Sequence, residues 1–566
     1  MKILSLHCDY IKFKPIKKAI KNPPKLTKEE EKGREVKEVL VILTAVEKWD
    51  SDVSLVVKEL VRNVKDIALQ VKAKNIVLYP YAHLSRDLGK PEMAQDILEK
   101  SEKALVKGGF KVVRAPFGYY KEFELKVKGH PLSELSREIR VGEKKGVEEY
   151  NLKQLLREIS KSKLDSSKLK ENDHRIIGKQ MDLFSFSEVA PGMVFWHNNG
   201  LIIMNELIKY WREEHVKAGY EEIQTPQIMD NKIWKISGHW DKYKENIFLT
   251  EYEKRDFAVK PMNCPGGMLV FKNSPKSYKD LPLRVGELGI VHRQELSGVL
   301  GGLFRVIQFT QDDAHIYCTE KQVEDEIKKI IELDCLFYKK FGFKYDIEFS
   351  TRPEKRIGTN EMWDKSEKVI ENVLKKNKIK YKLNPGDGAF YGPKIDFHLK
   401  DSLGRTWQCA TIQLDMSFPE RFELEYTDKD NKKKRPLILH RTIYGSLERF
   451  LGILLEHTNG RLPTWLSPVQ VKVLSFTDRN VKHCEKFVDK IKKEMPFLRI
   501  EVDFDQKTLQ AKVKDAEMMK IPWVIIVGDN EEKDKTISVR HENKVEYNVK
   551  VDDFIKSIKE LIEKRK

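Results

Sequence analysis

Apolar and polar positions alternate with two different periods along about the first 140 residues. Short apolar runs predict buried strands, and segments with an apolar residue at every third or fourth position predict amphipathic helices. The expected strands are 39–46, 75–79 and 110–114, and the expected helices are 53–73 and 91–108. The turn Ala115-Pro116-Phe117-Gly118 follows the last of these strands. We therefore expect a small α/β domain at this end of the chain.

The chain from Pro468 onward shows the same kind of alternation. The expected strands are 469–476, 499–504, 523–527 and 536–540, and the expected helices are 481–495, 508–519 and 552–564. This order predicts a mixed sheet covered by helices. About 100 residues are enough for such a domain to fold alone.

Two further segments lie between these ends. From 142 to about 170 the sequence is rich in Lys, Glu and Ser and has a helical patch at 152–159, which predicts a partly helical linker. From 174 to 465 helical patterns mix with many strand-like stretches and Gly/Pro turns. This long middle segment also holds most of the Trp and His residues.

Length and charge add to this picture. A chain of 566 residues is too long for one hydrophobic core, so three or four domains are expected. The 105 Lys and Arg residues exceed the 88 Asp and Glu residues, which gives a formal net charge of +17. Such a surplus suits a polyanionic partner such as RNA. A basic surface that only meets solvent is the alternative interpretation.

Cysteine usage and apolar runs bear on the compartment. The six cysteines are scattered without a CxxC pair, which favours free thiols in a reducing environment. The longest apolar run, near 39–46, is far shorter than the roughly 20 residues that cross a bilayer. The first residues form no signal-peptide core. We expect a soluble, cytoplasmic protein with no membrane partner.

Three stretches of the middle segment carry candidate chemistry, at 260–266, at 287–295 running on to 309–315, and at 440–450. Arg293 and Arg449 can each offer two parallel donors to a phosphate. Cys264 in a proline-bounded turn, together with histidines from distant segments, can form a zinc site that keeps one position open. Taken singly these signals are weak, because a lone Cys, His or Arg is usually structural.

Taken together and in this order, the stretches closely resemble the catalytic domain of threonyl-tRNA synthetases, which are class II aminoacyl-tRNA synthetases. The resemblance extends from about Asp173 to Trp465. Motif 1 of the class is matched by 219–226, motif 2 by 292–295 with 304–306, and motif 3 by 445–449. Further strings similar to the family are 237–241, 349–356, 391–395 and 411–415.

The resemblance implies roles for single residues. It implies zinc held by Cys264, His315 and His440. It implies an ATP site in which Arg293 grips the α-phosphate, Phe309 stacks on adenine, Arg449 holds the γ-phosphate, and Glu295, Arg305, Gln311 and Ser446 complete the pocket. It implies an amino-acid pocket of Asp313, Tyr391 and Gln413 with Met262 and Lys394 close by, His239 near the terminal ribose of tRNA, and Pro226 in a dimer interface. Mg²⁺ is expected to accompany ATP.

The sequence departs from the family pattern at a few positions. Motif 2 usually has proline where Leu296 stands, and a second basic residue is common where Ile307 stands. We expect both differences to alter loop stiffness or tRNA contact more than chemistry. Motif 3 lacks most glycines of the general class II form, as is usual for the family it resembles.

The small differences in binding free energy between threonine, valine and serine explain why such an enzyme uses zinc and needs proofreading. A hydrophobic pocket separates threonine from near-isosteric valine by only about 100-fold. A Lewis-acidic zinc with an open position can bind the amino group and the hydroxyl together, which excludes valine. Serine keeps the hydroxyl and lacks only a methyl group, worth roughly 1–3 kcal/mol. Serine is therefore misactivated at some rate, and a hydrolytic proofreading site is expected.

The N-terminal domain resembles the archaeal-type editing domain of this family, which is related in fold to D-aminoacyl-tRNA deacylases. The strings that carry the resemblance are 79–85, 115–121 and 129–134. The functional positions of the family fall on His83, Tyr120, Lys121 and Glu134. By this resemblance Lys121 and His83 would position a water and the terminal ribose. A domain kept only to grip tRNA is the alternative.

The C-terminal domain resembles the anticodon-binding domain of class IIa synthetases. Lys512, Lys514 and Arg540 are candidate RNA contacts there, although each can equally be solvated surface. Residues 505–510 differ from the sequence that bacterial members of the family have at this place. We therefore assign no residue that contacts an anticodon base.

The expected fold is therefore multidomain, α/β and α+β. It has an editing domain (1–141), a linker (142–172), a class II catalytic domain built on an antiparallel sheet (173–466) and a mixed α/β anticodon-binding domain (467–566). The expected activity is ATP-driven attachment of threonine to tRNA(Thr) by a zinc-containing homodimer, with hydrolysis of Ser-tRNA(Thr). A serine or proline synthetase is an alternative that the zinc set and editing domain disfavour. An RNA-binding regulator built on a retired synthetase is another, and the retained Arg293, Arg449 and zinc ligands argue against it.

Overall fold

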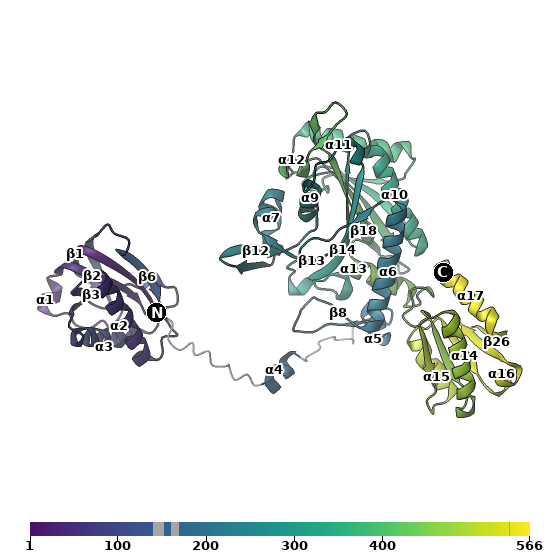
Figure 1. Ribbon diagram of the computed structural model, residues 1–566, viewed down its shortest axis with the longest axis horizontal. Helices are drawn as coiled ribbons and strands as arrows, with labels where there is room; N and C mark the ends of the chain where they lie inside the picture. The colour runs from purple at the N-terminus through teal and green to yellow at the C-terminus, as the bar shows by residue number, and fades with distance from the viewer. Residues whose placement is uncertain (140–151, 160–168, 543) are drawn as a thin grey trace. The chain divides into compact units, whose positions relative to one another are not determined.

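The computed structural model describes residues 1–139, 152–159, 169–542 and 544–566 (Figure 1). The chain divides into two compact units, Met1–Asn151 and Leu152–Lys566, and each is considered by itself. Within the described ranges no helix is long and apolar enough to cross a membrane.

The first unit is built on a six-stranded sheet in the order β4-β3-β2-β1-β5, with β6 paired to the first part of β1. Its strands are β1 (Lys2–Lys18), β2 (Arg34–Ala45), β3 (Asn75–Pro80), β4 (Lys111–Arg114), β5 (Tyr119–Val127) and β6 (Glu134–Glu138). Its helices are α1 (Lys28–Glu31), α2 (Val53–Gln70), α3 (Pro91–Lys107) and the 3₁₀ turn η1 (Ala82–Leu84). The predicted strands and helices of this domain are confirmed, and β1, β5 and β6 are additional.

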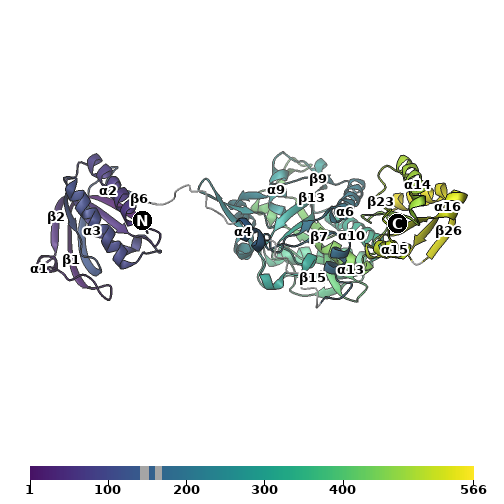
Figure 2. The same cartoon turned by 90° about the horizontal axis from the view of Figure 1, so that it is seen from below.

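Helices α2 and α3 lie against one face of this sheet (Figures 1 and 2). Val56, Leu60 and Val64 of α2 are fully buried there with Ile97 and Leu98 of α3. Side chains of this size stabilise the fold by about 1.5–3 kcal/mol each when they leave water. The spacing of the three α2 residues is the helical period that predicted the helix.

The larger part of the second unit is built on an eight-stranded sheet in the order β16-β15-β17-β18-β21-β14-β13-β9. All neighbouring strands are antiparallel except the pairs β15–β16 and β13–β9 at the two edges. The strands are β9 (Glu221–Glu222), β13 (Leu283–His292), β14 (Gln308–Cys318), β15 (Lys344–Ser350), β16 (Lys382–Asn384), β17 (Lys394–Lys400), β18 (Thr406–Asp415) and β21 (Leu437–Thr442). The expected antiparallel core is confirmed.

Helices α6, α10, α11 and α13 share one large hydrophobic core with this sheet. The helices of this part are α4 (Leu152–Ile159), α5 (His174–Gln180), α6 (Asn198–Lys217), α7 (Lys232–Ser237), α8 (His239–Tyr243), α9 (Cys264–Lys272), α10 (Val323–Lys340), α11 (Asn360–Lys376), α12 (Phe418–Arg421) and α13 (Leu447–Thr458). The short strands are β7 (Phe184–Ser185), β8 (Phe195–Trp196), β10 (Ile228–Asp230), β11 (Leu249–Tyr252), β12 (Arg255–Val259), β19 (Tyr426–Thr427) and β20 (Lys433–Lys434). The helical patch predicted at 152–159 coincides with α4, while the linker residues 142–151 and 160–168 lie outside the described residues.

The C-terminal part is a five-stranded mixed sheet in the order β23-β22-β24-β25-β26, with helices that can be followed in Figure 2. Its elements are β22 (Val471–Ser475), α14 (Val481–Glu494), β23 (Ile500–Asp503), α15 (Leu509–Met518), β24 (Trp523–Val527), α16 (Asp529–Asp534), β25 (Thr536–His541), β26 (Lys544–Lys550) and α17 (Val551–Glu563). Every element predicted here is present, and α16 and β26 are additional. Arg499 joins this part to the larger part of the same unit by donating to the Trp465 carbonyl (2.7 Å) and to Glu206 (2.9 Å).

Candidate active site and metal site

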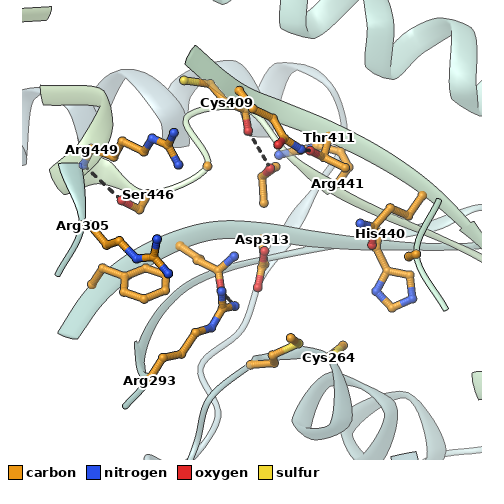
Figure 3. A pocket seen from close by; sticks show the side chains of 18 of the residues that line it. Cys264, Arg293, Arg305, Asp313, Cys409, Thr411, His440, Arg441, Ser446 and Arg449 are labelled. Carbon is orange, nitrogen blue, oxygen red and sulfur yellow. Dashed lines mark hydrogen bonds between the residues drawn. The ribbon is translucent and has the colours of Figure 1, made fainter. Parts of the chain in front are cut away.

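A cavity of about 1190 Å³ lies over the central strands of the eight-stranded sheet. The strand register places candidate residues side by side, because His440 on β21 pairs with His315 on β14 and with Gln413 on β18. Arg293, Arg305 and Arg449 lie at one side of the cavity and Cys264 and His440 at the other (Figure 3).

Cys264, His315 and His440 converge at the second side of the cavity. All three are buried, and their ligand atoms lie within 4.8 Å of one another. Three donors bound to one zinc ion at 2.0–2.3 Å in tetrahedral geometry would lie about 3.5 Å apart, so the set fits this ion after small shifts. Helix α9 begins at Cys264, while the histidines come from the sheet.

The electrostatics of these three groups also suit a cation. Burial raises the pKa of the Cys264 thiol well above its ordinary value, so its thiolate needs a neighbouring positive charge. Burial lowers the pKa of His315 well below its ordinary value, which keeps its imidazole neutral and able to ligate. The Nε2 of His440 lies 3.0 Å from Asp415 Oδ2, a carboxylate that orients the ring and leaves Nδ1 for an ion.

Among the described residues, two other clusters of side chains that could ligate a metal are already engaged in hydrogen bonds or ion pairs within the protein. His174 Nδ1 lies 2.6 Å from Glu456 while its Nε2 accepts the Leu303 N–H, so the ring joins α5 and α13 to the loop before β14. Lys394 lies between Asp387 (3.0 Å) and Asp396 (2.9 Å), where its ammonium supplies the positive charge. Neither arrangement leaves a set of free ligands.

Arg293 follows the end of β13, and its guanidinium is held by two hydrogen bonds. Its Nε donates to the Pro261 carbonyl (3.1 Å) and its Nη2 to Gln311 (3.3 Å). The guanidinium lies 5.1 Å from the centre of the Phe309 ring. Burial lowers its pKa, so an anionic ligand would improve the balance of charge.

Arg449 stands at the first turn of α13, whose N-cap is Ser446 with its Oγ accepting the Arg449 N–H (3.1 Å). Its buried Nε has no hydrogen-bond partner within the described chain, and its guanidinium lies 5.7 Å from the Trp407 ring. An unpaired buried donor that lines a cavity is suited to a ligand oxygen. Arg305 nearby donates to Glu295 through Nε (3.1 Å) and Nη2 (2.9 Å).

Further polar groups line the cavity between the arginines and the Cys264, His315 and His440 set. Asp313 is placed there by β14 (Figure 3), and Asn263 donates to its Oδ2 at 2.7 Å. Burial raises the pKa of Asp313 to about 6. The Tyr391 hydroxyl donates to Gln413 on the adjoining wall, and Met262 lines the cavity with them.

Two candidate residues are not at the cavity wall. His239 is fully buried, with Nδ1 on the Ser237 hydroxyl (2.8 Å), and its ring packs against Tyr243 and Phe390, which do line the cavity. Its Nε2 is buried and has no hydrogen-bond partner among the residues that the structure describes, so contact with a ribose would need those two rings to move. Lys394 points instead into the carboxylate pair described above.

Two carboxylates that the sequence did not single out join motif 2 to motif 3. Asp312 on β14 accepts the backbone N–H groups of Ile443 (2.9 Å), Tyr444 (3.0 Å) and Gly445 (3.0 Å). Glu448 at the start of α13 accepts the Thr310 N–H in return (2.9 Å). Both are buried, and burial raises the pKa of Glu448 to about 7. In the sequence Asp312 only follows motif 2 and Glu448 lies within motif 3, and neither position marks such a role.

We expect Asp312→Ala to destabilise the protein and weaken ATP use, because three buried N–H groups lose their acceptor. Each unpaired buried group costs about 1–3 kcal/mol. The thermal midpoint should fall by about 5–10 °C, and the KM for ATP should rise as the turn before Arg449 loosens. Exposed Asp325 on α10 provides the control, since Asp325→Ala should change neither quantity. Equal midpoints for the two variants would contradict this account.

The candidate editing residues divide into two groups. Lys121 Nζ donates to the carbonyls of Pro116 and Tyr119 (both 2.9 Å) and lies 5.1 Å from the Tyr79 ring. Tyr79 contacts Tyr81, and Tyr81 contacts His83, so these groups share one end of the sheet. Burial lowers the pKa of Lys121 to about 8.

Glu134 lies far from Lys121 along the sheet. It pairs with Leu6, whereas Lys121 pairs with Pro15 farther along the same strand β1. At about 3.3 Å per residue this separation is roughly 30 Å. Within one chain, Glu134 is therefore not brought to His83, Tyr120 and Lys121.

One candidate RNA contact of the C-terminal part is wrong. Lys512 is buried, 2% exposed, and donates to the backbone carbonyl (3.1 Å) and hydroxyl (3.3 Å) of Ser475. Its charged end therefore serves packing between α15 and β22 and is not available to a partner. Arg540 is tied to Glu517, and Lys514 is exposed.

Comparison with known families gives three matches along the chain. Residues 1–139 match the archaea-specific editing domain of threonyl-tRNA synthetase. Residues 248–458 match the class II tRNA synthetase core domain for G, H, P, S and T, and residues 469–561 match the anticodon binding domain.

Similar proteins with a curated function belong to the same family as these domain matches. The threonine–tRNA ligase of Caldanaerobacter subterraneus is 52% identical over 390 residues, which is 69% of this chain and 60% of that protein. That of Clostridium botulinum strain Loch Maree is 50% identical over 408 residues, 71% of this chain and 64% of that protein. The matches thus span about 60% of the length of these curated relatives.

Solved structures give the same result at the level of the fold. The RNA binding domain of threonyl-tRNA synthetase from Cryptosporidium parvum is 39% identical with a TM-score of 0.66, covering 69% of this chain and 98% of that one. A putative threonyl-tRNA synthetase from Aeropyrum pernix is 28% identical with a TM-score of 0.62, covering 69% and 95%.

Proposed function

Since the chain belongs to the threonyl-tRNA synthetase family, we propose that it activates L-threonine with ATP and transfers it to tRNA(Thr). One observation carries the proposal: the Cys264, His315 and His440 set lines the same cavity as two arginines, Arg293 and Arg449, that could each bind a phosphate. The first suits the recognition of an amino alcohol and the second the recognition of a triphosphate.

ATP would lie at the arginine side of the cavity. Arg293 would hold the α-phosphate while its neighbour Phe309 stacks on the adenine, and Arg449 would pair with the γ-phosphate through its unpartnered Nε. Mg²⁺ would accompany the phosphates. These fixed cations can stabilise negative charge that develops as diphosphate leaves, without reorganising during the reaction.

Threonine would lie at the other side. Cys264, His315 and His440 would hold Zn²⁺, which when bound would supply a Lewis acid for the amino and hydroxyl groups of the substrate. Asp313, aligned by Asn263, would face the amino group, and the Tyr391–Gln413 pair would close the side-chain pocket. The threonine carboxylate would then face Arg293 and the α-phosphate.

The test is amino-acid-dependent pyrophosphate exchange with zinc-replete protein. Threonine should support exchange, serine should support it weakly, and valine should not. Equal exchange with valine and threonine would remove the role given to the hydroxyl. Absence of exchange with threonine would remove the proposed activity.

We also propose that the N-terminal unit hydrolyses Ser-tRNA(Thr). Lys121 and His83 lie at one end of its sheet and would position a water and the terminal ribose, with Tyr120 beside them. Glu134 can belong to this site only if the distance along β1 is bridged. The proposed boundaries are 1–141 for editing, 173–466 for aminoacylation and 467–566 for anticodon binding, in a homodimer that uses Pro226 at its interface.

We expect Lys121→Ala to lower Ser-tRNA deacylation by about 100-fold or more while threonylation persists, because a positioned acid–base group typically contributes that much. Deacylation of preformed Ser-tRNA and threonylation of tRNA would be measured on the same full-length protein. Lys126, an exposed lysine on the same strand, gives the matched control Lys126→Ala. Undiminished deacylation by the Lys121 variant would refute the assignment.

A further inference from the structure

A run of five lysines joins β1 to α1 in the N-terminal unit. We call residues 17–28 the basic arm, and its lysines are Lys17, Lys18, Lys21, Lys25 and Lys28. No Asp or Glu interrupts them. All five are exposed, and none forms an ion pair with any residue that the structure describes.

The arm differs from the other lysine-rich surface of this unit. On α2 and α3 acidic residues are interspersed among the basic ones, and some of them pair, as Lys100 does with Asp96 (2.7 Å) and Arg62 with Glu59 (2.6 Å). The acidic run that follows the arm begins at Glu29, and its Glu30 carboxylate is engaged by Thr27 in a capping box. From Lys17 to Lys28 the arm is therefore a stretch of positive charge without an intervening acidic residue, and the acidic run begins only after Lys28.

The arm is fixed to the turn that carries the candidate editing residues. Lys17 and Lys18 pair with Tyr120 and Tyr119 across the β1–β5 ladder. Beyond the ladder, the Ala19 and Ile20 N–H groups donate to the Gly118 carbonyl at 2.8 and 3.3 Å.

Side chains strengthen this attachment. The Tyr119 hydroxyl donates to the Pro24 carbonyl (2.8 Å). Gly118 has φ +78°, and a Cβ there would come within 2.9 Å of Ile20 and Pro23. The arm therefore follows the turn closely and is not a loose tail.

The same turn holds the candidate editing lysine. The carbonyls of Pro116 and Tyr119 accept from Lys121, and the ammonium of Lys17 lies 5.4 Å from the centre of the Tyr120 ring. Tyr120 is 56% exposed. An exposed ring beside unpaired lysines is the combination that binds single-stranded nucleic acid, by stacking and by charge.

We propose that the basic arm binds phosphates at the acceptor end of tRNA and guides the mischarged 3′ end to the Lys121 turn, an inference that rests on the proposed editing function. Ammonium groups attract phosphates without reading sequence, and each contact releases condensed counterions. The arm thus supplies affinity for RNA, while the turn supplies the hydrolytic groups.

The test compares Lys18→Gln/Lys21→Gln/Lys25→Gln with a charge-matched control, Lys58→Gln/Lys103→Gln/Lys107→Gln, on the exposed sides of α2 and α3. Lys17 is left intact because it contacts Tyr120. Full-length proteins would be assayed for kcat/KM on Ser-tRNA between 50 and 200 mM salt, and on a seryl-adenosine ester that has no phosphate. Raising the salt over this range lowers kcat/KM wherever lysines contact phosphates. The loss of three such contacts should make this decrease about 20- to 40-fold smaller in the arm variant than in the wild type.

The expected result is a higher KM for Ser-tRNA at low salt and a flatter salt dependence in the arm variant, with unchanged seryl-adenosine hydrolysis and unchanged threonylation. The control variant should behave like wild type. An arm variant with the wild-type salt slope, or one that also loses seryl-adenosine hydrolysis, would overturn the inference. If wild type hydrolyses neither substrate, the editing proposal itself fails, which is a different outcome.

Discussion

Threonine-dependent pyrophosphate exchange should fall by about 1,000-fold or more in Cys264→Ala, because several kcal/mol of Lewis-acid stabilisation are lost with the metal. Cys264 is buried against His315 and His440, and the two histidines alone offer an incomplete ligand set. Any residual activation should discriminate threonine from valine by no more than about 100-fold, the limit of a pocket that only senses shape. Exchange with each amino acid and the zinc content of the purified protein would be measured together.

Cys318→Ala is the matched control for this experiment. Cys318 is fully buried on β14, the strand that carries His315, but it belongs to no metal-type cluster among the described residues. It should retain zinc and exchange while losing a comparable thiol. If Cys264→Ala kept both its zinc and its discrimination against valine, the recognition scheme would be wrong.

The sequence predicted those elements whose apolar pattern is clean. The apolar runs of β2 and β3 and the helical stripes of α2 and α3 are buried as their patterns require. Strand β1 was missed because its second half carries exposed lysines and Pro15, features that weaken a strand signal. That second half is stabilised by its pairing with both β2 and β5, and such long-range pairing is not visible in local periodicity.

For the candidate site, the sequence predicted most of the residues that line the cavity but not the residues that hold the surrounding backbone in place. The arginines and metal-type residues come from motif strings, which the family resemblance could assign. Asp312 and Glu448 hold backbone N–H groups more than 130 residues away in sequence, and nothing local marks either carboxylate for that role. Burial is equally hard to read from a sequence, since Lys512 resembles an RNA contact until its partner on Ser475 is seen.

Arg293→Ala should lower kcat/KM for ATP in adenylate formation by about 100- to 1,000-fold, the usual effect of removing one preorganised donor from a developing anion. The Pro261 carbonyl and Gln311 aim this guanidinium along the cavity, and no other described arginine has the same anchors. Stopped-flow or exchange kinetics at varied ATP would show whether KM or kcat carries the loss.

Arg293→Lys separates charge from geometry. A lysine keeps the positive charge but cannot make two parallel bonds to a phosphate, so it should recover less than about tenfold of the loss. Arg255→Ala, at an exposed residue paired with Asp230, removes a guanidinium outside the cavity and should leave the kinetics unchanged. Full recovery with lysine would mean that Arg293 acts only as a charge, and the forked contact to the α-phosphate would have to be given up.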